Sequence, residues 1–130
     1  MSARPVSFLD LKAINARERE ALIAAFTRVL DSGWYVLGEE VAAFEREYAQ
    51  YCGTQFAVGV GNGLDALTLS LRAYRELSRL QAGDEVIVPA NTYIATILAI
   101  SENGLTPVLV EPDLATCNLN AARIVPALTS

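Results

Sequence analysis

The chain has 130 residues, of which 52% are hydrophobic and 19% charged, and this is enough apolar material for the core of one domain. The net charge is -5, with acidic and basic residues mixed along the sequence, which argues against a nucleic-acid-binding protein. No apolar stretch reaches the roughly 18 residues of a membrane span and the first residues lack a signal-peptide core, so we expect no membrane partner and a cytoplasmic location.

Segment 1–53 is predicted to be helical. Apolar residues recur at helical spacing over 14–32, which indicates an amphipathic helix with a charged opposite face. Gly33 is expected to end this helix. A second helix is expected over 39–52 and would end at Gly53.

The loop between these two helices carries Trp34 and Tyr35, flanked by Gly33 and Gly38. Aromatic side chains in such a loop can contact a sugar or bridge two subunits. They can equally anchor the loop between its helices. The sequence leaves both interpretations open.

Segment 54–130 is predicted to be the start of an α/β domain. Strands are expected at 56–60, 85–90 and 106–112, and helices at 64–80 and 92–102. Because the strands are apolar on both faces and alternate with helices, we predict a mostly parallel sheet with helices on both faces. The last eight residues, 123–130, indicate a helix without a closing glycine, so we interpret the chain as an incomplete protein.

The first candidate site loop is the glycine-rich segment Gly59–Gly63, which leads directly into a helix. Such a loop leaves backbone N–H groups free at the helix N-terminus, where the helix dipole favours a phosphate. The loop lacks the Lys-Ser/Thr pair of a P-loop, and its third glycine comes one residue too early for the dinucleotide motif. An ordinary turn with Asn62 as N-cap and Asp65 as part of a capping box explains the pattern equally well.

The second candidate loop runs from Pro89 to Tyr93. It lies at the carboxyl edge of the predicted sheet, where ligands of parallel sheets bind. Asn91 or Thr92 is expected to cap the following helix. Tyr93, in the first turn of that helix, can stack on a planar ligand, but it can also be a core or interface residue.

The chain lacks the residues that most often transfer protons or form Schiff bases. It has no histidine and a single lysine, Lys12, which we expect to be a solvated charge. Glu111 and Asp113 are expected to be solvated carboxylates rather than an acid/base pair. Cys52 and Cys117 match no zinc-binding spacing, so we expect no metal site and two reduced thiols in or near the core.

Five stretches occur in the order and spacing seen in the DegT/StrS family of sugar-nucleotide aminotransferases. They are "FLDL", "SGWYVLGEEVAAFE", "VGNGLDALTLSLRA", "GDEVIVPANTYIATILAI" and "PVLVEPD". The chain resembles the N-terminal part of these enzymes, which have the aspartate-aminotransferase fold. The resemblance therefore implies the start of a fold type I large domain, with its α/β part over 54–130.

The family resemblance also implies that pyridoxal 5'-phosphate (PLP) is the cofactor. By this resemblance Gly63 and Leu64 supply backbone N–H groups to the cofactor phosphate, with Asn62 beside them. Tyr93 is similar to the aromatic residue that stacks on the pyridine ring. Many relatives have serine or threonine where Leu64 stands, so only the backbone contact of Leu64 carries over.

The expected activity follows from the same resemblance. The motifs are most similar to members that move an amino group from glutamate to C3 of a keto-deoxy sugar on a nucleoside diphosphate, with dTDP-3-keto-6-deoxyhexose as the expected substrate. Such enzymes are homodimers, and Trp34 and Tyr35 are candidates for contacting the nucleotide-sugar substrate. The Schiff-base lysine of the family follows residue 130, so we expect no catalytic residue in this chain and no activity of this segment alone.

Two other classes of protein are weighed against the aminotransferase. A non-catalytic nucleotide-binding domain of Rossmann type would use the same glycines, but its second strand normally ends in an acidic residue, where this chain has Pro89 and Ala90. An interaction module would need no glycine-rich turn into a helix. Only the mixed-charge helices over 14–50 favour that class.

Overall fold

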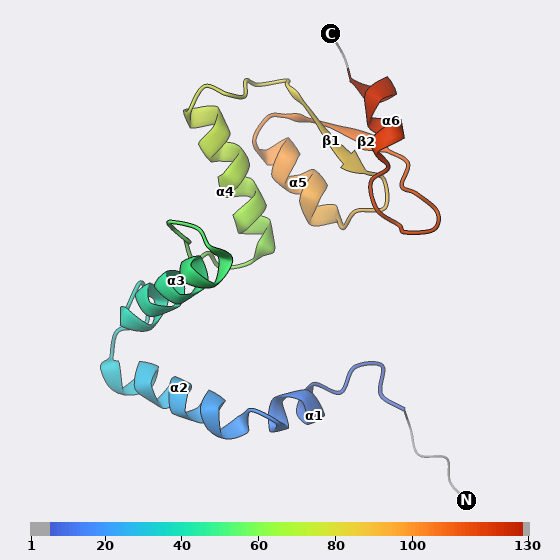
Figure 1. The fold of residues 1–130 in the computed structure, drawn as a ribbon. Coiled ribbons are helices and arrows are strands. Elements are labelled where there is room, and N and C mark those ends of the chain that lie inside the picture. Colours follow the sequence, from blue (N-terminus) through green and yellow to red (C-terminus); the bar gives the residue numbers. More distant parts are fainter. Residues whose placement is uncertain (1–5, 129–130) are drawn as a thin grey trace, which may run out of the picture. The chain divides into compact units, whose positions relative to one another are not determined.

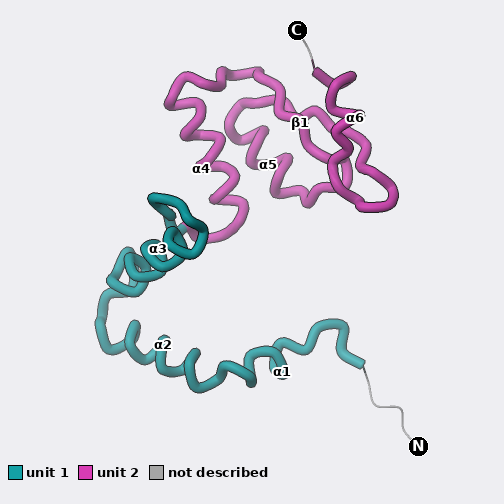
Figure 2. Tube along the Cα trace, viewed as in Figure 1, with its two compact units in different colours: residues 1–59 teal, residues 60–130 magenta. Residues whose placement is uncertain are grey.

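The computed structural model describes residues 6–128, which divide into two compact units (Figures 1 and 2). Unit 1 ends at Gly59 and unit 2 begins at Val60. The predicted domain division after residue 53 stays a prediction. Within residues 6–128 no helix is both long and apolar enough to cross a membrane.

Unit 1 is built from helices. These are α1 (Leu11–Ala16), α2 (Arg19–Ser32) and α3 (Glu39–Cys52). The prediction of one continuous helix over 14–32 is wrong, because the chain turns at Arg17 and Glu18. Their N–H groups bond to carbonyls three residues earlier, with N···O distances of 3.3 Å, and this tighter turn separates α1 from α2.

Glycines end α2 and α3, as predicted. Gly33 and Gly53 cap these helices in the left-handed region, with φ of 64° and 68°. A side chain would strain this backbone, so glycine at both positions gives each helix a defined end. Arg28 of α2 donates two hydrogen bonds to Glu40 of α3, at 2.9 and 3.0 Å, and this hydrogen bonding lowers the pKa of the Glu40 carboxyl.

Unit 2 is a parallel α/β arrangement. Its elements are α4 (Gly63–Glu76), β1 (Glu85–Pro89), α5 (Ile94–Glu102), β2 (Thr106–Val110) and α6 (Ala121–Ile124), followed by a 3-10 turn at Val125–Ala127. The two strands run parallel, with Glu85 opposite Thr106 and Pro89 opposite Val110. The predicted α/β class with a parallel sheet is confirmed.

Helix α4 ends at Glu76, before the predicted end at Leu80. Ser78 has a left-handed φ of 56°, so the helix cannot continue through it. The turn then allows Leu80 to pack against the core of unit 2. The gain from burying Leu80 explains the earlier helix end.

The core of unit 2 lies between the two strands and two helices. Val88 of β1, Ile100 of α5 and Leu105 are buried, and they are packed against by Leu71, Leu80, Val86 and Ile97. Val86 and Val88 are two positions apart on β1, so they face the same side of the sheet. Helices α4 and α5, which lie side by side in Figure 1, contribute Leu71, Ile97 and Ile100 to this cluster.

Asn103 is a buried polar residue that connects α4 with α5. Its side chain is 2% exposed, and its Nδ2 donates to the carbonyls of Thr68, at 3.1 Å, and Ala99, at 2.8 Å. The backbone carbonyl of Asn103 accepts a hydrogen bond of 2.6 Å from Arg75 Nη1 of α4. A buried amide with satisfied hydrogen bonds therefore fixes the end of α5 on the side of α4.

The strand predicted at 56–60 does not form. Phe56 and Val58 are exposed, and the N–H of Gly59 donates to the Glu45 carboxylate at 2.6 Å instead of to a neighbouring strand. Among the described residues β1 and β2 pair only with each other. An apolar segment without a strand partner does not become a strand, whatever its side-chain pattern.

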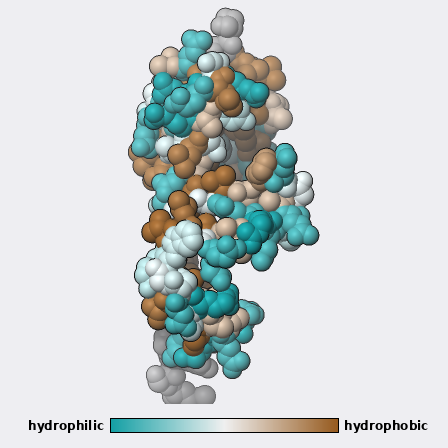
Figure 3. Space-filling view, turned by 90° about the vertical axis from the view of Figure 1, so that its left-hand side faces the viewer, coloured by the Kyte–Doolittle hydropathy of each residue, from teal (hydrophilic) through white to brown (hydrophobic). Residues whose placement is uncertain are grey.

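Large hydrophobic side chains lie at the surface of both units, where Figure 3 shows them among hydrophilic ones. In unit 1 they include Phe26, Phe44 and Phe56, and in unit 2 Leu109 and Leu114. Exposed apolar side chains in such numbers are typical of surfaces that contact more protein.

Candidate functional site

The glycine-rich loop delivers free donors to the start of α4. Asn62 is the N-cap, and its Oδ1 accepts a hydrogen bond of 3.0 Å from the N–H of Asp65. The N–H groups of Gly63 and Leu64 have no acceptor among the described residues. The predicted cap by Asn62 is confirmed, and it leaves two donors at the positive end of the helix dipole.

The carboxylate of Asp65 folds back onto the same loop. Its Oδ2 accepts a hydrogen bond of 3.0 Å from Asn62 Nδ2 and not from the Asn62 backbone, so only one half of the expected capping box, the bond from the Asp65 N–H to Asn62, is formed. A Cβ at Gly61 would lie 2.8 Å from this oxygen, whereas a Cβ at Gly63 would meet no atom within 4 Å. Gly61 therefore makes room for Asp65, and the backbone at Gly63 is open to a ligand.

Tyr93 is the N-cap residue of α5 and not a member of its first turn. Its backbone is extended, with φ of -67° and ψ of 143°, and its side chain is 79% exposed. The prediction that Asn91 or Thr92 caps the helix is wrong. Thr92 Oγ1 instead shares a hydrogen bond of 2.8 Å with Thr96 Oγ1, which holds the entry to α5.

Asn91 connects the Pro89–Tyr93 loop, the tyrosine loop, to a loop over 113–118 that the sequence analysis did not predict. Asn91 Nδ2 donates to the carbonyl of Cys117 at 3.1 Å. The loop over 113–118 is closed by backbone bonds from Asp113 to Asn118, at 2.9 Å, and from Cys117 to Asp113, at 2.8 Å. The sequence signal for such a loop is an aspartate followed within three residues by threonine, which favours an Asx turn.

The carboxylate of Asp113 stabilises this loop. Its Oδ1 accepts from the N–H groups of Ala115 and Thr116, both at 3.0 Å, and from the Thr116 hydroxyl at 3.2 Å. These hydrogen bonds lower the pKa of the Asp113 carboxyl, and the largest effects come from the backbone N–H groups of Thr116 and then Ala115. Asp113 is thus a carboxylate that stabilises its own loop.

The two candidate loops of unit 2 lie on one side of that unit. Figure 1 shows the N-terminal ends of α4 and α5 at the same lower side, toward which β1 points. The Asn62–Leu64 segment begins α4, and Tyr93 precedes α5. Free N–H donors and an exposed aromatic ring therefore occur on the side where parallel α/β folds bind ligands.

Trp34 and Tyr35 belong to unit 1, and their contacts there are with residues close in sequence. The hydroxyl of Tyr35 donates to the carbonyl of Leu30 at 3.3 Å. A Cβ at Gly38 would lie 2.7 Å from the carbonyl oxygen of Trp34, so the loop packs tightly against the start of α3. Both aromatic residues are more than half exposed, so they are accessible to a ligand.

The remaining candidate residues lie outside these loops. Lys12 is an exposed residue of α1, and Glu111 is exposed after β2. Cys52 and Cys117 are free but exposed, so the expectation of core thiols is wrong. Cys52 is the last residue of α3, and Cys117 lies within the 113–118 loop with a φ of 57°.

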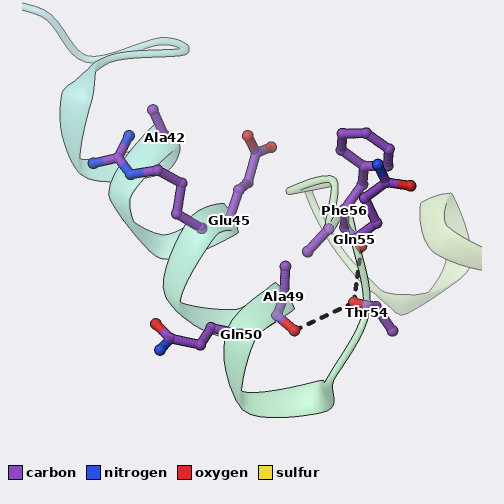
Figure 4. A pocket seen from close by; sticks show the side chains of 9 residues that line it. Ala42, Glu45, Ala49, Gln50, Thr54, Gln55 and Phe56 are labelled. Carbon is purple, nitrogen blue, oxygen red and sulfur yellow. Dashed lines mark hydrogen bonds between the residues drawn. The ribbon is translucent and has the colours of Figure 1, made fainter.

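A hollow of about 470 Å³ in unit 1 contains none of the predicted site residues. It lies between α3 and the segment after it, and its lining includes Glu45, Gln50 and Phe56 (Figure 4). Thr54 Oγ1 donates to the carbonyls of Ala49, at 3.4 Å, and Phe56, at 3.1 Å. The described residues contain no group of three metal-ligating side chains here or elsewhere.

Solved structures of aminotransferases share this fold. The crystal structure of DesV from Streptomyces venezuelae, in complex with a ketimine intermediate, matches with a TM-score of 0.85 and 51% identity over 95% of this chain and 32% of that one. NtdA from Bacillus subtilis, with bound cofactor PMP, matches with a TM-score of 0.87 and 28% identity over 99% of this chain and 29% of its own. The chain therefore has the fold of the fold type I aminotransferases.

The chain belongs to the DegT/DnrJ/EryC1/StrS aminotransferase family, whose sequence pattern matches residues 16–130. It is 57% identical to the dTDP-3-amino-3,6-dideoxy-alpha-D-galactopyranose transaminase of Aneurinibacillus thermoaerophilus and 50% identical to the dTDP-3-amino-3,4,6-trideoxy-alpha-D-glucose transaminase of Streptomyces venezuelae. These similarities cover 96% and 95% of this chain and 33% and 32% of the relatives. The family expected from the motifs is confirmed, and the chain spans about a third of the length of its curated relatives.

Proposed function

We propose that the full-length protein is a PLP-dependent aminotransferase that moves the amino group of glutamate to a keto-deoxy sugar on a nucleoside diphosphate. The observation that carries this proposal is the 57% identity, over nearly the whole chain, to a dTDP-3-amino-dideoxy-sugar transaminase. A dTDP-3-keto-6-deoxyhexose is the proposed acceptor, and glutamate leaves as 2-oxoglutarate. The Rossmann-type alternative lacks comparable support.

The residues of unit 2 fit the two chemical demands of the cofactor. The unpartnered N–H groups of Gly63 and Leu64 suit a phosphate at a helix N-terminus, with Asn62 holding the turn. The exposed ring of Tyr93 suits the flat face of a pyridine. When bound, PLP supplies an electron sink for reactions at the carbon that bears the amino group.

The part of the reaction assigned to this chain is binding and orientation. The single lysine, Lys12, lies in α1 of unit 1, and we assign the Schiff-base lysine to a part of the full-length protein outside this chain. Leu64 brings no hydroxyl, so its backbone N–H alone serves the phosphate. This chain then contributes the phosphate cradle and the ring platform.

The remaining expectations are part of the proposal. A homodimer is proposed from the family resemblance, and the exposed hydrophobic side chains of both units suit contacts with the rest of the full-length protein or with a second copy. Trp34 and Tyr35 are proposed to contact the nucleotide sugar. A soluble biosynthetic enzyme of this kind acts in the cytoplasm. Sedimentation of the full-length protein tests the dimer, and an active monomer would contradict it.

The cofactor assignment is tested by Gly63→Pro in the full-length protein, with Gly63→Ala as the matched control. Proline removes the N–H but is favoured at the first helical position, and Asn62 before it is already extended. A Cβ at Gly63 would meet no atom within 4 Å, so the alanine of the control fits there. A lost charge-assisted hydrogen bond predicts roughly ten- to hundredfold weaker PLP binding for Gly63→Pro only.

The readout for these variants is the absorbance of bound PLP during titration. Tyr93→Ala is expected to weaken binding by about two- to tenfold through the lost stacking. Equal affinities of Gly63→Pro and Gly63→Ala would rule out the phosphate cradle. A full-length protein that never takes up PLP would overturn the cofactor assignment altogether.

The substrate assignment is tested by 2-oxoglutarate release. The full-length protein with glutamate and a dTDP-3-keto-6-deoxyhexose is expected to form an amino sugar and one 2-oxoglutarate for each sugar consumed. The matched control is the corresponding 4-keto sugar. Turnover of the 4-keto sugar alone would refute the proposed position of amination.

A further inference from the structure

Backbone hydrogen bonds hold the loop that carries Tyr93, whereas the ring of Tyr93 is exposed. Ala90 N–H donates to the Val110 carbonyl at 2.8 Å, and Thr92 N–H to the Pro89 carbonyl at 3.1 Å. Tyr93 itself makes no ring contact and no side-chain hydrogen bond among the described residues. Its direction is thus set by the loop and not by packing of the ring.

Asn91 uses its side chain for a hydrogen bond to a segment distant in sequence. Its amide donates at 3.1 Å to the carbonyl of Cys117, which lies 26 positions away. That carbonyl is presented by the closed 113–118 loop, where Cys117 has a left-handed φ of 57°. The acceptor is therefore fixed by a loop with its own hydrogen bonds, which include those to the Asp113 carboxylate.

We infer that Asn91 is a positioning residue, which orients Tyr93 toward the pyridine ring by fixing the preceding backbone to the Cys117 carbonyl. This inference rests on the proposed function, because it needs Tyr93 to stack on the cofactor. Without the Asn91 amide, the backbone before Tyr93 gains conformational freedom that binding must remove again. The 113–118 loop acts as the support on which this orientation depends.

The test is a double-mutant cycle on PLP affinity in the full-length protein. Asn91→Ala is expected to weaken PLP binding by about two- to fivefold, and by no more than Tyr93→Ala does, because Asn91 acts only through the position of the ring. The same change in a Tyr93→Ala background is expected to have almost no effect, because Asn91 acts through the ring. Asn91→Asp, which keeps the shape but loses the donor, is expected to behave like Asn91→Ala.

Asn120→Ala is the matched control. Asn120 also uses its side chain for one hydrogen bond, accepting from the N–H of Ala122 at 2.9 Å, but this bond caps α6 and does not involve the tyrosine loop. The PLP affinity of the Asn120→Ala variant is expected to equal that of the unchanged protein. Asp113→Ala, which opens the supporting loop, is expected to weaken binding like Asn91→Ala and not to add to it.

The outcomes separate this inference from the proposed function. An unchanged affinity for Tyr93→Ala overturns both the ring platform and the role of Asn91. Weaker binding for Tyr93→Ala but not for Asn91→Ala overturns the role of Asn91 alone. If Asn91→Ala weakens PLP binding equally in the unchanged protein and in the Tyr93→Ala background, Asn91 acts on the general structure and not through the ring. This result also overturns the inference.

Discussion

Replacing Asn103 by alanine is expected to loosen the packing of α4 against α5. The substitution removes two hydrogen bonds from the buried amide, to Thr68 at 3.1 Å and to Ala99 at 2.8 Å. Each such bond contributes about 1 kcal/mol net, and the lost side-chain volume adds a small cavity. The expected loss for the helix pair is about 2 to 3 kcal/mol.

Hydrogen exchange in the full-length protein measures this loss locally. Backbone amides of α4 and α5 that exchange when the pair opens are expected to do so roughly thirty- to a hundredfold faster in Asn103→Ala. Asn118→Ala is the control, because Asn118 is exposed and its side chain has no partner among the described residues. Equal exchange in both variants would refute the role given to the buried amide.

Further expectations concern single contacts. Arg75→Met, which removes the 2.6 Å bond to the Asn103 carbonyl, should destabilise unit 2 by about 1 to 2 kcal/mol in denaturant unfolding. Gly61→Ala should displace the Asp65 carboxylate at a cost below about 1 kcal/mol, and a larger loss would show that the turn itself is strained. Because the Asp113 pKa is lowered on folding, its stabilisation exists above the unfolded pKa of about 4 and is lost as pH falls through the lower folded pKa. The protection factor of the Thr116 amide, which is the intrinsic exchange rate at each pH divided by the observed rate, should therefore fall in acid, and Asp113→Asn should remove that change. The 130-residue chain, treated with PLP and borohydride, should show no adduct beyond nonspecific labelling of Lys12, and transfer of an amino group by this chain would contradict the assignment of the lysine elsewhere.

Local signals in the sequence predicted the helix ends and the turn at the candidate site. Gly33 and Gly53 end their helices because left-handed backbone depends on the residue itself. Asn62 caps α4 because its partner, the N–H of Asp65, is three positions away. Features decided by neighbours in sequence were therefore predictable.

Features decided by distant partners were not predictable. The segment 56–60 has the pattern of a strand, but a strand requires a neighbour, and Gly59 bonds to Glu45 instead. The bond of Asn91 to Cys117 and the bond of Asn103 to Thr68 join residues far apart in sequence. Such pairs are set by the topology of unit 2, so the capping preference of asparagine and threonine placed Asn91 or Thr92 at a helix cap and could not show the actual partner of Asn91.

A crystal structure of the full-length protein with PLP bound would most directly test the central claim, which is that this chain binds the phosphate and the ring of the cofactor. The account predicts that the cofactor phosphate accepts hydrogen bonds from the N–H groups of Gly63 and Leu64. It also predicts that the ring of Tyr93 lies flat against the pyridine. A phosphate bound away from the start of α4, or a Tyr93 ring that does not touch the cofactor, would contradict the account.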